Sequence, residues 1–250
     1  MFYKDIQFST GQIYLNICEK EDLPSPIKTN IPQWFKKLEH NFHNRTIKGC
    51  MPFLDTLTSG YLLKFPQDMY IKHNFLNEKD QKISIYDFSL GSELKDSGVN
   101  LNFAGEGSHH DVKQVQGSHF LNKHGHYPLY KIKNPWHIKT PSGYSCLFVP
   151  PLNNSDDRFE ILSGIVDTDS HPIPINFPFV INGDKYKTLE TTIKKGTPYV
   201  HIIPFKRDNW KMKILAQKDK DPNVSLSKGF WFTTFLHNYK NKVWSKKIWK

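Results

Sequence analysis

The sequence predicts a mainly β protein, with a β-clip-like or other double-layer sheet core, short helices and a C-terminal helix. Short strand-like segments recur between residues 129 and 206. Gly, Pro and Asn separate them at turn spacing, which is typical of sandwiches and barrels rather than of alternating strand–helix units. One longer amphipathic segment, residues 228–250, follows this core and predicts the terminal helix.

The elements expected in the core follow from runs of apolar and β-branched residues bounded by turn residues. The strands expected there are residues 129–132, 136–140, 144–150, 161–166, 173–181, 191–194 and 199–206.

Shorter elements are expected before the core. Alternation of apolar and polar residues predicts two strands, at residues 2–8 and 13–17. Helical turns are expected at 33–41, and a short helix at 51–57 that ends at the following glycine. A Gly- and Ser-rich stretch, residues 91–117, predicts a long loop or a functional insertion.

We expect a single domain over residues 1–250, because no low-complexity linker divides the chain. Its parts are an N-terminal region of strands, short helices and a His-rich loop (1–128), the β core (129–206) and a C-terminal extension with a helix (207–250).

Composition excludes several classes. No run of about 18 apolar residues occurs, so no membrane span is expected. The first ten residues include Lys4 and Asp5 and do not resemble a signal peptide. The three cysteines form no C-x-x-C pair, which indicates reduced thiols and a cytoplasmic protein.

The net charge of +10 rests on 34 basic residues, of which only Arg45, Arg158 and Arg207 are arginines. Arginine is the side chain suited to bidentate recognition of bases and phosphates, whereas lysine is a hydrated point charge. Lysines so dominant and so evenly spread indicate AT-rich coding. They argue against a specific nucleic-acid partner.

Histidines are dense between residues 109 and 126. His109 and Asp111 have a two-residue spacing, as do His124 and His126 on one face of an expected strand. With the distant His201, followed by Arg207, they form a pattern that resembles a 2-oxoglutarate-dependent iron oxygenase. A divalent metal, iron or zinc, is therefore a candidate cofactor. The alternative is a polar loop whose histidines bond to backbone or water.

Three segments in the second half follow one another in an order found in a known superfamily. They are Thr140-Pro-Ser-Gly-Tyr144, Gly164-Ile-Val-Asp-Thr-Asp169 and Lys195–Phe205. Their order resembles the trimeric dUTPase and dCTP-deaminase superfamily, which has the β-clip fold. The resemblance places Asp167 in the water-activating position of a nucleotide hydrolase. Alternatively, Asp167 and Asp169 are solvated turn acids.

The second half as a whole, from Trp136 to Pro198, also resembles an uncharacterised family of bacterial and phage genomes. That resemblance implies no mechanism. It suggests a phage-encoded protein acting in the host cytoplasm, or one associated with the virion.

The C-terminal region interleaves aromatic residues with lysines. With the basic tail, such a face could lie on a membrane or a nucleic-acid strand, but more often it docks on its own core or on a partner subunit. The candidate partner-binding residues are Trp231, Phe235, Trp244 and Trp249.

Two classes of function follow. The favoured one is a non-catalytic accessory or structural protein with a β-rich binding module, acting on a protein partner or as a homo-oligomer. The alternative is an enzyme, either a metal-dependent oxygenase or a divergent dUTPase-like hydrolase.

Overall fold

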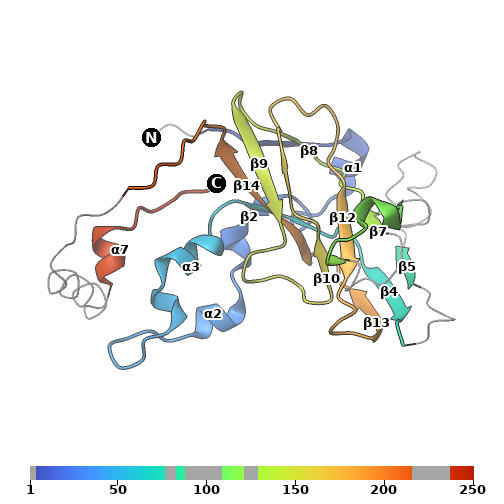
Figure 1. The fold of residues 1–250 in the computed structure, drawn as a ribbon, viewed down its shortest axis with the longest axis horizontal. Coiled ribbons are helices and arrows are strands. Elements are labelled where there is room, and N and C mark those ends of the chain that lie inside the picture. The colour runs from blue at the N-terminus through green and yellow to red at the C-terminus, as the bar shows by residue number, and fades with distance from the viewer. Residues whose placement is uncertain (1–3, 77–82, 88–108, 121–128, 216–236) are drawn as a thin grey trace. The chain divides into compact units, whose positions relative to one another are not determined.

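The computed structural model describes residues 4–76, 83–87, 109–120, 129–215 and 237–250 of the chain. The fold is mainly β, as the sequence predicts, with several sheets and few short helices (Figure 1). The chain divides into two compact units. Unit 1 comprises Met1–Ser25 and Gly60–Lys206, and unit 2 comprises Pro26–Ser59 and Arg207–Lys250. No helix among the described residues is long and apolar enough to cross a membrane.

Among its described residues, unit 1 contains the sheets, the short helix α1 and the 3-10 turn η3. Its elements are β1 (Gln7–Ser9), α1 (Gln12–Ile17), β2 (Ser25–Pro26, where the chain passes into unit 2), β3 (Tyr61–Lys64), β4 (Met69–Asn74), β5 (Ile83–Asp87), β6 (His109–His110), the 3-10 turn η3 (Val112–Val115), β7 (Leu129–Ile132), β8 (His137–Lys139), β9 (Tyr144–Val149), β10 (Phe159–Ile161), β11 (Gly164–Val166), β12 (Phe177–Ile181), β13 (Thr188–Ile193) and β14 (Pro198–Lys206).

The largest sheet has the strand order β11-β9-β14-β3-β2. Its central pair is antiparallel, with a register that runs from His201 opposite Val149 to Lys206 opposite Tyr144. Side chains alternate between the two faces of a strand. This register therefore places the buried Phe148 and Ile202 opposite each other.

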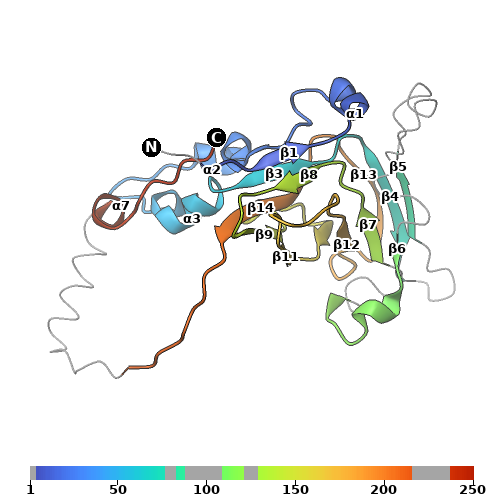
Figure 2. The ribbon, with the colours of Figure 1, turned by 90° about the horizontal axis from the view of Figure 1, so that it is seen from above.

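A second sheet has the strand order β10-β12-β7-β6 (Figures 1 and 2). It packs against the largest sheet through aromatic rings. The ring centroid of Phe177 on β12 lies 5.4 Å from that of Phe148 on β9 and 5.8 Å from that of Tyr199 on β14. All three side chains are buried. Large aromatic rings packed in this way contribute much of the apolar area that the fold removes from water.

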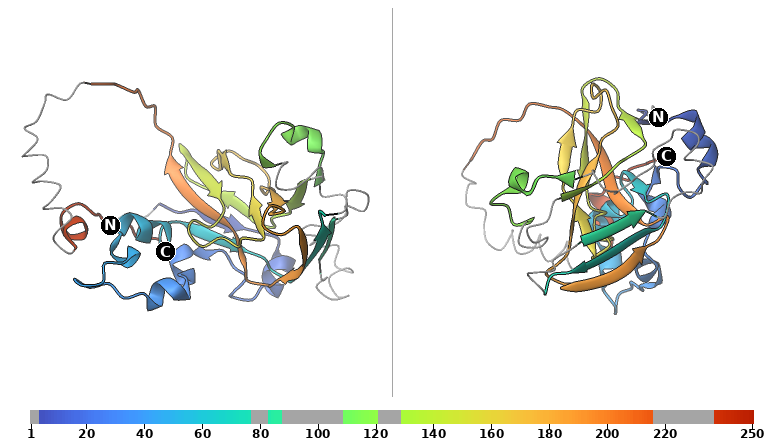
Figure 3. Two further views of the ribbon diagram at one scale, coloured as in Figure 1. Left: turned by 60° about the horizontal axis from the view of Figure 1, so that its bottom comes forward. Right: turned by 90° about the vertical axis from the view of Figure 1, so that its right-hand side faces the viewer.

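A third sheet has three strands in the order β13-β4-β5 (Figure 3). Six residue pairs join β13 to β4. Arg158 connects β13 to the start of β10. Its guanidinium donates to both carboxylate oxygens of Asp156, at 2.9 and 2.6 Å, and to Thr191 Oγ1 and the Thr192 carbonyl oxygen. The hydrogen bonds with Asp156 raise the pKa of Arg158, so the guanidinium keeps its charge.

Unit 2 is built from short helical turns: η1 (Ile27–Asn30), α2 (Gln33–Lys37), η2 (Ile47–Gly49), α3 (Met51–Thr56) and α7 (Asn238–Lys242). Helices of five or six residues are not stable alone and depend on packing. Phe35 of α2 stacks on Phe53 of α3 with ring centroids 5.7 Å apart, and Trp34 packs edge-on against both rings.

Two local predictions were wrong. Residues 13–17 belong to helix α1 rather than to a strand. The alternating apolar residues Ile13, Leu15 and Ile17 do not mark a buried strand face, because all three are exposed and only Tyr14 of this segment is buried. Of the loop expected at residues 91–117, only residues 109–117 are described, and they contain strand β6 and the whole of the turn η3. The terminal helix is present as α7, within the predicted range, and residues 216–236 lie outside the described chain.

Gly60, at the start of β3, has a backbone φ of +95° and no space for a side chain. A Cβ there would overlap the Ile202 carbonyl oxygen and lie 2.9 Å from His201 Nε2. Glycine is therefore required both by its dihedral angle and by the close approach of β14.

We expect Gly60→Ala to lower the free energy of unfolding by at least about 2 kcal/mol, since backbone strain and overpacking add. The matched control is Gly196→Ala, where φ is +81° but nothing lies within 4 Å of the added Cβ. That variant should cost only about 1 kcal/mol. Urea unfolding of both variants measures the difference, and equal losses would show that the contact with β14 is unimportant.

Candidate functional site

The three segments 140–144, 164–169 and 195–205 lie on or directly beside neighbouring strands of unit 1. β9 pairs with β11 on one side and with β14 on the other. At the end of these strands, Ser145 Oγ donates to Asp167 Oδ1 at 2.6 Å, and the Gly143 amide donates to Asp169 Oδ2 at 2.8 Å. Asp167 is exposed. Both carboxylates therefore stabilise the turns at this end of the strands by hydrogen bonds, and Asp167 remains accessible to solvent.

Thr140 and Thr168, beside these turns, form a buried polar pair that no sequence pattern indicates. The hydroxyls of Thr140 and Thr168 are 2.7 Å apart, and Thr168 also donates to Cys146 Sγ at 3.3 Å. Burial raises the pKa of the Cys146 thiol to about 11. The thiol is therefore neutral at physiological pH. It accepts a hydrogen bond from Thr168 in the core and is not suited to act as a nucleophile.

The candidate metal ligands occupy separate elements. His109 pairs with Tyr130 at the edge of the four-stranded sheet, and Asp111 accepts a hydrogen bond from the Lys113 amide at the start of η3. His201 is buried in β14 of the other sheet. His124 and His126 lie outside the described residues. Within the part of the chain that the structure describes, no group of three His, Cys, Asp or Glu side chains could hold a metal ion.

The C-terminal tryptophans are held within unit 2. Trp244 Nε1 donates to both carboxylate oxygens of Asp55 at 3.1 Å, and Lys247 forms an ion pair with the same carboxylate at 2.6 Å. The Trp249 carbonyl oxygen accepts from Lys28. Trp244 and Trp249 are half-buried, while Trp231 and Phe235 lie outside the described residues.

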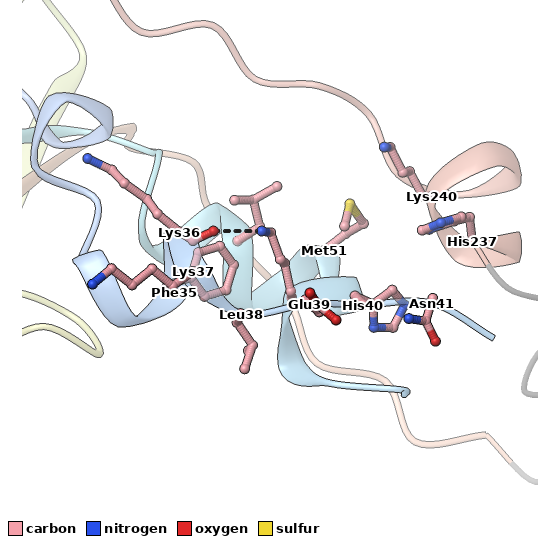
Figure 4. Close-up of a pocket in the computed structure, with 12 residues that line it drawn as sticks. Phe35, Lys36, Lys37, Leu38, Glu39, His40, Asn41, Met51, His237 and Lys240 are labelled. Atoms are coloured by element: carbon pink, nitrogen blue, oxygen red, sulfur yellow. Dashed lines mark hydrogen bonds between the residues drawn. The ribbon is translucent and has the colours of Figure 1, made fainter. Parts of the chain in front are cut away.

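Unit 2 also contains an open pocket of about 780 Å³, a size typical of ligand sites (Figure 4). Its apolar side is formed by α2 and α3, and its polar rim by lysine and histidine side chains. The apolar lining residues are Phe35, Leu38, Met51 and Leu54, and the ionisable ones are Lys36, Lys37, Glu39, His40, Lys48, His237 and Lys240.

The charge of this pocket is positive, with four lysines against one glutamate. Lys48 donates to the Lys36 carbonyl oxygen at 2.9 Å, at the carboxyl end of α2 (Figure 4). Among the residues that the structure describes, Lys36, Lys37 and Lys240 form no ion pair. Figure 4 shows the ammonium groups of Lys36 and Lys37 on one side of the pocket and that of Lys240 on the other, so an anionic ligand would have to extend across the apolar side to meet both.

His40 is held in a defined orientation in the pocket. Its Nδ1 accepts a hydrogen bond from the Thr46 amide at 3.0 Å, which in the neutral ring places the proton on Nε2. The ring lies directly over Gly49, where an added Cβ would overlap it. The His237 ring approaches from α7, with ring centroids 5.6 Å apart.

Sequence reasoning missed this pocket. The sequence predicts helical turns at residues 33–41 and an aromatic face interleaved with lysines near the C-terminus, and neither pattern indicates a pocket. The available signal was the repeated pairing of lysine with histidine in both segments, at Lys37 and His40 and again at His237 and Lys240.

No protein-family model matches the chain, and comparisons with curated proteins and with solved structures found no match.

We expect Gly49→Ala to displace the His40 ring, because the new methyl group would occupy its place. The ring would then lose its hydrogen bond with the Thr46 amide. NMR spectra of the histidine ring and of the Thr46 amide measure this. Gly11→Ala is the control, since nothing lies within 4 Å of a Cβ there. An unshifted Thr46 amide in Gly49→Ala would contradict the fixed placement of His40.

Proposed function

We propose that this chain is a non-catalytic binding module, a phage-type accessory or structural protein that acts in the cytoplasm or on the virion. Its pocket in unit 2 binds an acidic segment of a partner protein. The observation that carries the proposal is the set of lysines, Lys36, Lys37 and Lys240, without ion pairs among the described residues, beside an apolar wall.

The chemistry of the rim favours carboxylates on a flexible chain. Lysine supplies a mobile point charge, whereas a phosphate site is more often built with the planar fork of arginine or with backbone amides. No arginine lines this pocket. The apolar side, with the buried Phe35 and Met51, offers an anchor for one hydrophobic side chain of the same segment.

The test is the binding of a fluorescein-labelled peptide in which Asp and Glu flank a single Phe, measured by anisotropy on the full chain. We expect Lys36→Glu/Lys37→Glu to weaken binding by at least about tenfold, because two attractive charges become repulsive. Binding should also weaken as salt rises.

The matched control is Lys20→Glu/Lys187→Glu, which makes the same change of charge at exposed positions of unit 1. It should change the affinity less than about twofold. Equal weakening by both pairs would mean general electrostatic attraction to a basic protein. No binding by the parent chain, or unchanged binding when Asn and Gln replace the peptide's acids, would remove the proposal.

A second candidate function is a divergent dUTPase-like nucleotide hydrolase. The observation that favours it is the convergence of the three resembling segments on β11, β9 and β14, with the exposed Asp167 at their end. In that reading Asp167 activates a water molecule for attack on a nucleotide phosphate.

This candidate predicts that the parent chain releases pyrophosphate from dUTP or dCTP. Asp167→Ala should lower the rate by at least about a hundredfold, because the general base is removed. Asp184→Ala, an exposed acid elsewhere in unit 1, should retain the rate. Thermal unfolding followed by circular dichroism checks that both variants fold. No turnover by the parent chain would eliminate the hydrolase.

A further inference from the structure

The chain that follows β14 exposes large apolar side chains. Residues 207–215, here called the arm, have no helix, strand or turn (Figure 2). Trp210 is 92% exposed, Met212 83% and Ile214 86%. Single exposed apolar residues are ordinary on protein surfaces, but three at alternate positions in one segment form a continuous apolar stripe.

The arm has the residue pattern of a half-buried strand. Lys211 and Lys213 alternate with Trp210, Met212 and Ile214. In extended chain, successive side chains point to opposite faces. The arm therefore has one apolar and one basic face, the pattern with which an added strand pairs with a sheet edge.

The largest sheet of unit 1 offers such an edge at β11. This strand is hydrogen-bonded only to β9 within the described sheet. Ile165 at its centre is 64% exposed, and a Cβ added at Gly164 would meet nothing within 4 Å. Asp167 and Asp169 follow β11 directly, and their carboxylates accept hydrogen bonds from Ser145 and Gly143 at the other side of the strand.

The direction of the strands decides whose arm can pair there. β11 and β14 are both antiparallel to β9, so they run parallel to each other. β14 ends at Lys206 beside Tyr144, at the same end of the sheet at which β11 finishes with Val166. The chain after Lys206 therefore continues past that end, and only a reversal would bring it alongside its own β11. The arm of residues 207–215 contains no turn that could reverse it.

We propose that the arm of one copy adds as a strand to β11 of a second copy of this chain. A second copy related by a two-fold axis would send its arm in from the end at which β11 finishes. That arm would run antiparallel to β11, with its apolar stripe on the face of the sheet that carries Ile165. Each copy gives and receives one arm, so the assembly closes as a dimer.

The mass of the full chain in solution tests the proposal, measured by sedimentation equilibrium. We expect a species of twice the 29.3 kDa monomer mass. Trp210→Ser/Met212→Ser/Ile214→Ser removes the apolar stripe and should give a monomer. The control Ile173→Ser also removes an exposed apolar side chain of unit 1, and it should remain dimeric.

A second variant tests the receiving edge. Ile165→Lys places a charge under the stripe and should also give a monomer. A mixture of the arm variant with Ile165→Lys should recover dimers, because an intact arm then meets an intact edge once per pair. A monomeric parent chain, or a dimeric arm variant, would overturn the proposal. A dimeric Ile165→Lys variant, or a mixture that stays monomeric, would overturn the assignment of β11.

Discussion

The pairing of β9 with β14 is the constraint on which unit 1 depends. Every other strand of the largest sheet is attached to one of these two, directly or through β3. A shift of their register by one residue would turn Phe148 and Ile202 out of the core and bring their polar neighbours in. The same register sets Ser145 beside Asp167, so core packing and the polar edge are fixed by one ladder of hydrogen bonds.

Unit 2 is held together in a different way. Its helices are too short to be stable alone, and two side-chain arrangements stabilise them instead. Aromatic stacking joins α2 to α3. The Asp55 carboxylate of α3 binds the C-terminal segment by a hydrogen bond from Trp244 and an ion pair with Lys247. An aspartate with two oxygens shared between an indole and an ammonium is well satisfied. The pocket lies on this scaffold and includes residues from both ends of the sequence.

The sequence predicted the elements of unit 1 better than any site. The strands between residues 129 and 206 were predictable because apolar residues alternate there and turn residues bound each run. The same alternation rule failed at residues 13–17, because the alternating apolar side chains there are exposed and only Tyr14 is buried. The pocket was not predictable, because Lys37 and Lys240 are about 200 positions apart and no local pattern records that the fold brings them to one cavity.

Arg158 has a consequence for how unit 1 opens. Its side chain is bonded to Asp156 beside β10 and to Thr191 and Thr192 of β13, strands that belong to different sheets. Separating β13 would leave a charged guanidinium and a largely buried carboxylate without part of their hydrogen bonds, which is costly. The amide hydrogens of β10 and β13 should therefore exchange with solvent in one shared opening event. The three-stranded sheet then unfolds together with the core and not independently of it.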